Sequence, residues 1–260
     1  MLCLLWERGT LGVEHAADDG VASVLIAYFP RGAGADRGLL DTLRSVPGTE
    51  AEPVDVPLVD WVARFREGFH GQDAGGFRIV PVWDKTAPGP RTLVVDPGCA
   101  FGTGTHETTR LCLASLERLA AGPGLGRVLD IGTGSGLLAI AALRLGATAA
   151  FGVDNDIPAL FSAARHAQLN QVSISLLAGD AGRPFRGGGF DTVVANLTAP
   201  LLIEKSAELD GLCSARGRLV LSGFLVVDVP ELRAAYGSLG PLEESHDGEW
   251  AALMVGPTGT

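Results

Sequence analysis

Three glycines at alternate positions, followed by an acidic residue at the end of a later apolar run, form the stretch best suited to hold a ligand. Gly132, Gly134 and Gly136 come directly after the apolar run at 128–131. Glycine suits a tight turn against which a ligand lies, because a Cβ atom would block the approach. Asp154 ends the next apolar run, about 20 residues later, where a carboxylate can accept hydrogen bonds from ribose hydroxyls. The pattern predicts a nucleoside cofactor.

The spacing of the glycines bears on which cofactor the turn holds. The dinucleotide fingerprint is G-x-G-x-x-G, whose third glycine would fall on Leu137. Here the third glycine is Gly136, which makes the pattern G-x-G-x-G. A pyrophosphate needs a bare helix N-terminus close by, whereas S-adenosylmethionine carries no phosphate. We therefore favour S-adenosylmethionine over a dinucleotide and over a turn that binds nothing.

An alternation of strands and helices is predicted to position these residues. The run at 127–131 is typical of a buried parallel strand, and 137–143 of a buried helix that ends at Gly146. Further strands are predicted at 149–153, 174–177, 190–196 and 218–221, and further helices at 156–170, 200–209 and 230–239. Two final strands flank Asp247-Gly248, which is a hairpin signal. The order predicts a doubly wound sheet with one reversed strand.

The first third of the chain follows a different pattern. A strand is predicted at 21–28, a short helix at 39–45 and a helix at 60–66. Between them, 47–57 carries three prolines and is expected to be extended, so we place a domain boundary between about 58 and 75.

Composition and charge narrow the classes of function. The chain has 260 residues, 47% of them hydrophobic, which is enough for a packed core. Its formal charge of -10 disfavours a nucleic-acid backbone and suits a basic partner. No apolar run reaches the ~18 residues that span a bilayer. The four cysteines form no C-x-x-C pair and have no histidine at zinc spacing, so we expect no metal and reduced thiols in a cytoplasmic protein.

The stretch DPGCAFGTGTHETT at 96–109 has the composition of a binding loop before a helix. Thr108 and Thr109 either meet a ligand carboxylate or simply cap that helix. His106 is either a general base, since histidine titrates near neutrality, or a residue that shapes the pocket. The remaining histidines are expected at the surface: His15, His70, His166 and His246.

Several stretches resemble one known family. The alternation with a terminal hairpin is similar to the class I S-adenosylmethionine-dependent methyltransferase fold. More specifically, DPGCAFGTGTHETTRLCL, VLDIGTGSGLLAIAALRLGA, GVDNDIPAL, VVANLTAPLL and LVLSGFL resemble the ribosomal protein L11 methyltransferase family. AFGTGTHETT is the specific stretch, because the G-x-G-x-G turn is shared across the superfamily. The resemblance covers nearly all of 93–255 and continues more weakly upstream.

The resemblance implies an α/β fold, with a doubly wound, mostly parallel seven-stranded sheet and a small α+β N-terminal domain. The expected domains are a ferredoxin-like substrate-recognition domain at 1–58, a linker helix and connecting segment at 59–92, and a methyltransferase domain at 93–260. The family uses S-adenosylmethionine to methylate amino groups of a basic ribosomal protein, on a lysine side chain or the N-terminal amine. No membrane and no direct nucleic-acid contact is expected.

The family's cofactor positions fall by motif on Thr109, Gly132, Asp154 and Asn196. To these we add Gly134, from the same turn, and Asp180, whose place after the third strand suits an adenine contact. Asn196 is also the expected catalytic residue: its amide carbonyl can orient the substrate amine, although an amide is no base. Related enzymes carry Asn-Pro-Pro-Tyr there, whereas this chain has Asn196-Leu197-Thr198-Ala199, a departure that the family shares.

Two further expectations follow. A ferredoxin-like domain should open with a strand and a helix before the strand at 21–28, so we expect an incomplete N-terminal domain with its first strand absent. The alternatives to ribosomal protein L11 are another protein lysine, a small molecule, or a cofactor-binding module without catalysis.

Overall fold

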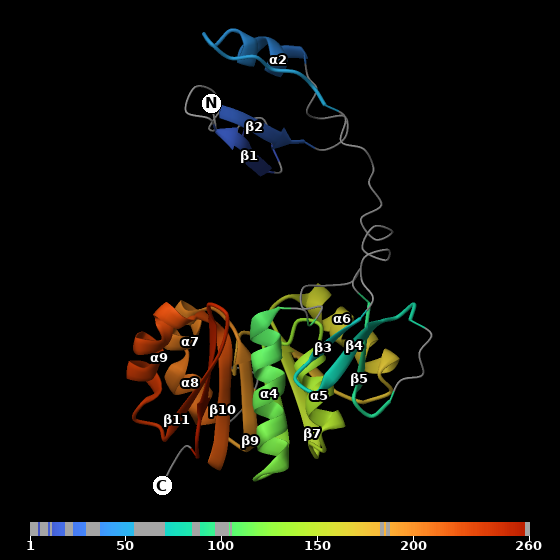
Figure 1. Cartoon of the computed structure of the whole chain (residues 1–260), viewed down its shortest axis with the longest axis vertical. Helices are drawn as coiled ribbons and strands as arrows, with labels where there is room; N and C mark the ends of the chain where they lie inside the picture. Colours follow the sequence, from blue (N-terminus) through green and yellow to red (C-terminus); the bar gives the residue numbers. More distant parts are fainter. Residues whose placement is uncertain are drawn as a thin grey trace. The chain divides into compact units, whose positions relative to one another are not determined.

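The computed structural model describes residues 5, 10, 12–18, 23–29, 37–54, 71–84, 89–96, 104, 106–182, 185 and 188–257. It divides into two compact units, Met1–Val59 and Asp60–Thr260, and each is considered by itself (Figure 1). The helix expected at 60–66 and most of the loop at 97–105 lie outside the described residues.

The first unit contains a hairpin and a helix. Strand β1 (Gly12–Asp18) pairs antiparallel with β2 (Ser23–Tyr28), and α2 (Arg37–Arg44) follows. No strand is predicted before residue 21, so β1 corrects that expectation. The sequence of β1, GVEHAAD, has no apolar alternation, and its strand conformation comes from pairing with the apolar SVLIAY of β2.

The second unit is built on a seven-stranded sheet with the order β11-β12-β10-β9-β6-β7-β8. Its strands are β6 (Arg127–Ile131), β7 (Ala149–Asp154), β8 (Ser175–Ala178), β9 (Phe190–Asn196), β10 (Cys213–Leu225), β11 (Leu242–Asp247) and β12 (Trp250–Val255). Only β12 runs against its neighbours β10 and β11. The predicted doubly wound sheet with one reversed strand is confirmed.

Helices cover both faces of this sheet. They are α4 (Glu107–Ala121), α5 (Leu137–Arg144), α6 (Ile157–Leu169), α7 (Ala199–Glu204), α8 (Ser206–Leu212) and α9 (Val229–Tyr236). Val128 points into the core beneath α4 and α5, whereas the next residue, Leu129, points into the core beneath α7, α8 and α9. This alternation along one strand produces two hydrophobic layers, so the sheet is buried on both faces.

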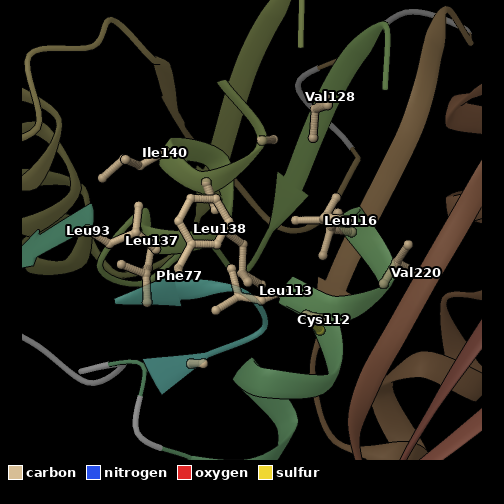
Figure 2. Packing of buried hydrophobic residues seen from close by; sticks show 14 of the residues in the cluster. Phe77, Leu93, Cys112, Leu113, Leu116, Val128, Leu137, Leu138, Ile140 and Val220 are labelled. Atoms are coloured by element: carbon tan, nitrogen blue, oxygen red, sulfur yellow. The ribbon is translucent and has the colours of Figure 1, made fainter. Parts of the chain in front are cut away.

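A second, three-stranded sheet contributes to the core beneath α4 and α5. It consists of β3 (Gln72–Ala74), β4 (Phe77–Pro81) and β5 (Thr92–Val95) in that order. Figure 2 shows Phe77 and Leu93 from this small sheet meeting Leu113 of α4 and Leu137 of α5. The segment 59–92, expected to be a linker helix and connecting segment, contains β3 and β4, which share the core of the second unit.

One predicted helix is divided in two. The helix expected at 200–209 is α7 followed by α8, and Lys205 between them has φ -91° and ψ 6°. The following strand, β10, begins at Cys213 rather than at 218.

Candidate functional site

The glycine turn between β6 and α5 lies at the carboxyl edge of the parallel strands. Gly132, Gly134 and Gly136 all have positive φ, at 66°, 52° and 76°. A Cβ atom on Gly132 would lie 2.6 Å from Leu197, and one on Gly136 would lie 3.0 Å from Cβ of Ala163. The turn therefore needs glycine for both its conformation and its packing.

Asp154 lies beside this turn, as the sequence predicts. Its Oδ2 accepts a hydrogen bond from the Gly134 backbone N–H at 2.9 Å, and its Oδ1 accepts one from the Asp156 N–H at 2.9 Å. The carboxylate is partly exposed at the end of β7. Two backbone donors thus fix its orientation at the edge of the turn.

Asn196 ends β9, the strand that pairs with β6 on the side opposite β7. After β6 the chain continues to β7 on one side of β6, whereas the later strand β9 pairs with β6 on its other side. The sheet order therefore reverses at β6, and Asn196 and the glycine turn lie at this topological switch point, where α/β sheets bind ligands. Leu197, the next residue, packs against Gly132. Within the described part of the chain, the half-buried side chain of Asn196 has no hydrogen-bond partner.

Asp180 follows β8 at the same edge. The Gly179 N–H donates to the backbone carbonyl of Asp154 at 3.0 Å, which joins the ends of β7 and β8. The Asp180 carboxylate is paired with Nζ of Lys205 at 3.0 Å. Asp180 is a predicted site residue, whereas its partner Lys205, from the distant α7–α8 junction, is not.

The start of α4 completes the edge, and here the capping role of His106 is clear. Its Nδ1 accepts a hydrogen bond from the Thr108 N–H at 3.3 Å, and its ring packs edge-on against Trp250 with centroids 4.6 Å apart. Because Nδ1 is an acceptor here, the proton of the neutral ring lies on Nε2. The capping bond is the role that the geometry gives His106, and its use as a general base stays a prediction. Thr108 and Thr109 are both buried in the first turn.

Asp130 is a site feature that the sequence analysis missed. It lies near the end of β6, fully buried directly before the glycine turn, and accepts a hydrogen bond from the Thr133 hydroxyl at 2.8 Å. Burial raises the pKa of this carboxyl to about 7. A polar residue inside the apolar run VLDI was the available signal, because a buried carboxyl needs specific partners.

His166 corrects the expectation that the remaining histidines are surface groups. It is buried, with Nε2 accepting from the Asp96 N–H at 2.9 Å and Nδ1 within 2.8 Å of the Ser162 carbonyl. Burial lowers its pKa, so the ring stays neutral. His246 is exposed, whereas His70 and the side chain of His15 lie outside the described residues.

Among the described residues, no three histidine, cysteine or acidic side chains come together as metal ligands would. No helix of the described chain combines the length and the apolar character that crossing a membrane requires.

The sheet order, the reversed hairpin strand, the glycine turn and the acid at the end of the next strand together define a Rossmann-like methyltransferase fold. Comparison with known families identifies which one. The family model described as Ribosomal protein L11 methyltransferase (PrmA) matches residues 18–257. The chain belongs to this family, whose fold implies a methyl donor of the S-adenosylmethionine type.

Individual relatives agree with this assignment. The chain is 38% identical over 230 residues to a ribosomal protein L11 methyltransferase from Geobacter sulfurreducens, covering 85% of this chain and 75% of the relative. It is 39% identical over 265 residues to one from Thermus thermophilus, covering 97% of this chain and all of the relative. A crystal structure of ribosomal protein L11 methylase from Lactobacillus delbrueckii subsp. bulgaricus matches with a TM-score of 0.66 and 30% identity, over 73% of this chain and 100% of that chain.

Proposed function

We propose that this protein transfers methyl groups from S-adenosyl-L-methionine to amino groups of ribosomal protein L11, on a lysine side chain or the N-terminal amine. The observation that carries the proposal is the meeting of the glycine turn, Asp154 and Asn196 at one edge of the sheet. Family membership supports the substrate, since the relatives carry the name ribosomal protein L11 methyltransferase. A ribosomal substrate also supports a cytoplasmic location.

The glycine turn suits such a cofactor. Gly132 is exposed and Gly134 is half-buried, both with positive φ, and a Cβ atom on Gly132 would lie 2.6 Å from Leu197. In the proposed roles, these glycines lie against the cofactor and the Asp154 carboxylate accepts the ribose hydroxyls. Thr109, in the first turn of α4, serves the methionine end, and Asp180 serves the adenine.

Bound in this cradle, the cofactor supplies a methyl group already activated by a sulfonium. The protein's part is to hold a neutral amine in line with that methyl, at roughly 3–3.5 Å. We assign this task to Asn196, whose side-chain carbonyl accepts an N–H of the amine and orients its lone pair. An amide without a hydrogen-bond partner among the described residues suits the role, because an incoming donor displaces no hydrogen bond made there.

The test is transfer to defined substrates. The purified chain is incubated with methyl-labelled cofactor and either unmethylated ribosomal protein L11 or a ribosomal extract, and labelled amines are located by peptide mass spectrometry. We expect label on L11. Label on other proteins or on small molecules, with none on L11, would contradict the substrate. Cofactor binding with no transfer to any acceptor would contradict catalysis.

A further inference from the structure

The turn after β8 is held in place from outside by the junction between α7 and α8. Nζ of Lys205 lies 3.0 Å from Oδ2 of Asp180 and 3.5 Å from Oε2 of Glu208. The other oxygen of Glu208, Oε1, accepts a hydrogen bond from the Gly182 N–H at 2.8 Å. The turn is therefore held at two points: Lys205 binds the Asp180 side chain, and Glu208 binds the Gly182 backbone amide.

The backbone of this turn, at Ala181 and Gly182, is itself constrained. Ala181 has φ 49°, a left-handed conformation that residues with a Cβ adopt only when their surroundings impose it. A Cβ atom on Gly182 would lie 2.6 Å from Leu212 of α8, so the turn and the helix are in close contact. The side chain of Lys205 is only 10% exposed. A nearly buried lysine that bonds two carboxylates is a fixed anchor rather than a mobile surface charge.

This turn continues directly from the ribose side of the site. The Gly179 N–H bonds the Asp154 carbonyl, and the Asp154 carboxylate bonds the Gly134 N–H. A chain of contacts thus runs from the glycine turn through Asp154 to Asp180 and on to Lys205. The base of a nucleoside whose ribose meets Asp154 would lie next to the Asp180 turn.

We propose that Lys205 and Glu208 are positioning residues that make the site select adenine over a base without the 6-amino group, because they fix the orientation of Asp180. The inference rests on the proposed function. A carboxylate has about four acceptor positions, so the bond to Lys205 leaves Asp180 able to accept the N6 amino group of adenine. Hypoxanthine presents a carbonyl oxygen at that position, which meets a fixed carboxylate with repulsion and without a hydrogen bond. A carboxylate that could rotate would turn away from the hypoxanthine oxygen, so the affinities for the two bases would differ less.

The experiment compares two ligands by isothermal titration calorimetry on the full chain: S-adenosylhomocysteine and S-inosylhomocysteine. The wild type should prefer the adenine compound by about 2- to 12-fold, the factor for one net hydrogen bond to a carboxylate that is 46% exposed. In Lys205→Met this ratio should fall toward 1, and in Lys205→Arg, which keeps the ion pair, it should be retained. Glu208→Ala, which frees Gly182, should also lower the ratio and decides the matter if Lys205→Met fails to fold.

The matched control is Arg233→Met, which removes an ion pair away from the site, the one between α9 and β11 with Glu244 at 2.6 Å. It should leave the ratio unchanged. A loss of affinity for both ligands by the same factor in Lys205→Met, with the ratio kept, overturns the positioning role, as does a wild type that binds both equally. A wild type that binds neither ligand contradicts the proposed function itself, so the two failures are distinguishable.

Discussion

Asp154 has a carboxylate that already bonds two backbone N–H groups, those of Gly134 and Asp156. These bonds orient it before any ligand arrives, so little reorganisation is needed on binding. Asp154→Ala removes the charged acceptor for the ribose hydroxyls and should weaken cofactor binding by 10- to 150-fold, or about 1.5–3 kcal/mol. Titration calorimetry measures this directly. The matched control is Asp156→Ala, two residues away, whose side chain makes no capping bond. Equal affinity in wild type and Asp154→Ala, both folded, would remove Asp154 from the site.

Asn196 should matter for the rate of transfer more than for folding. Its side chain has no hydrogen-bond partner among the described residues, so its loss breaks no internal contact there. Asn196→Ala should lower the single-turnover rate by roughly 10- to 1,000-fold at saturating cofactor, because the amine is no longer held in line. Thr198→Ala, at an exposed position two residues on, is the control. An unchanged rate in a folded Asn196 variant would show that the residue does not orient the amine.

The individual residues also show what the sequence could predict. Gly132, Gly134 and Asp154 belong to one continuous strand-turn-helix-strand segment, so their meeting follows from local pattern alone. Asp180 and Lys205 meet only after the chain has passed through β9 and α7, and nothing in their spacing indicates the pair. Asp130 was passed over because an apolar run was treated as uniformly structural, although a buried carboxyl requires specific partners.

Helix α6 supports the site through the edge of β5. The Asn170 side chain bonds both the N–H and the carbonyl of Val94, at 2.8 and 2.7 Å, and so imitates a neighbouring strand. His166 accepts the Asp96 N–H, and Arg165 bonds the Asp96 carboxylate twice. This clamp joins the helix after Asp154 to the strand that leads toward residues 97–105. Its parts are far apart in sequence, which is why His166 was wrongly expected at the surface.

The clamp makes stability depend on pH with a definite sign. Burial lowers the pKa of His166 below its unfolded value of about 6.5, so below that pH the unfolded chain binds the proton more readily. The stability that neutral His166 supports is present above pH ~6.5 and is lost as pH falls through its folded pKa. Asp130 has a raised pKa and acts in the opposite direction: its contribution is present at low pH and is lost as pH rises through about 7.

Comparison of variants isolates the histidine contribution. His166→Gln keeps an acceptor for the Asp96 N–H but cannot titrate, so its free energy of unfolding should fall less than that of wild type between pH 7.5 and pH 5. Urea denaturation at the two pH values measures this difference. His246→Gln, which changes an exposed histidine, should behave as wild type. Identical pH dependence in wild type and His166→Gln would contradict the role given to the buried ring.

The bounds of strands and helices were predicted well where one hydrophobic pattern runs through the whole segment. Strands β6, β7 and β9 are mostly apolar runs, and their bounds match the expected ones within a residue or two. The failures came where tertiary context decides. Strand β1 exists through its pairing with β2, and α7 and α8 are separated at Lys205, which turns toward Asp180. No local signal distinguishes such a break from a continuous helix.

The whole molecule separates the proposed tasks between its two units. Every predicted cofactor residue lies in the second unit, Asp60–Thr260, and so do both hydrophobic clusters of the main sheet. The first unit, Met1–Val59, contributes none of them. Its expected role is to dock a large substrate, and the net charge of -10 suits a basic one.

This division makes a prediction for a shortened chain that starts at Asp60. Because the second unit contains its own cores, the fragment should fold and bind S-adenosylhomocysteine within about threefold of the full chain. Its kcat/KM for ribosomal protein L11 should fall by about 100-fold, since the substrate amine then reaches Asn196 without docking energy. A short lysine peptide, too small to use the docking unit, is the control substrate and should react equally with both chains. If the fragment methylates L11 as efficiently as the full chain, recognition lies in the second unit, and the docking role of residues 1–59 is wrong.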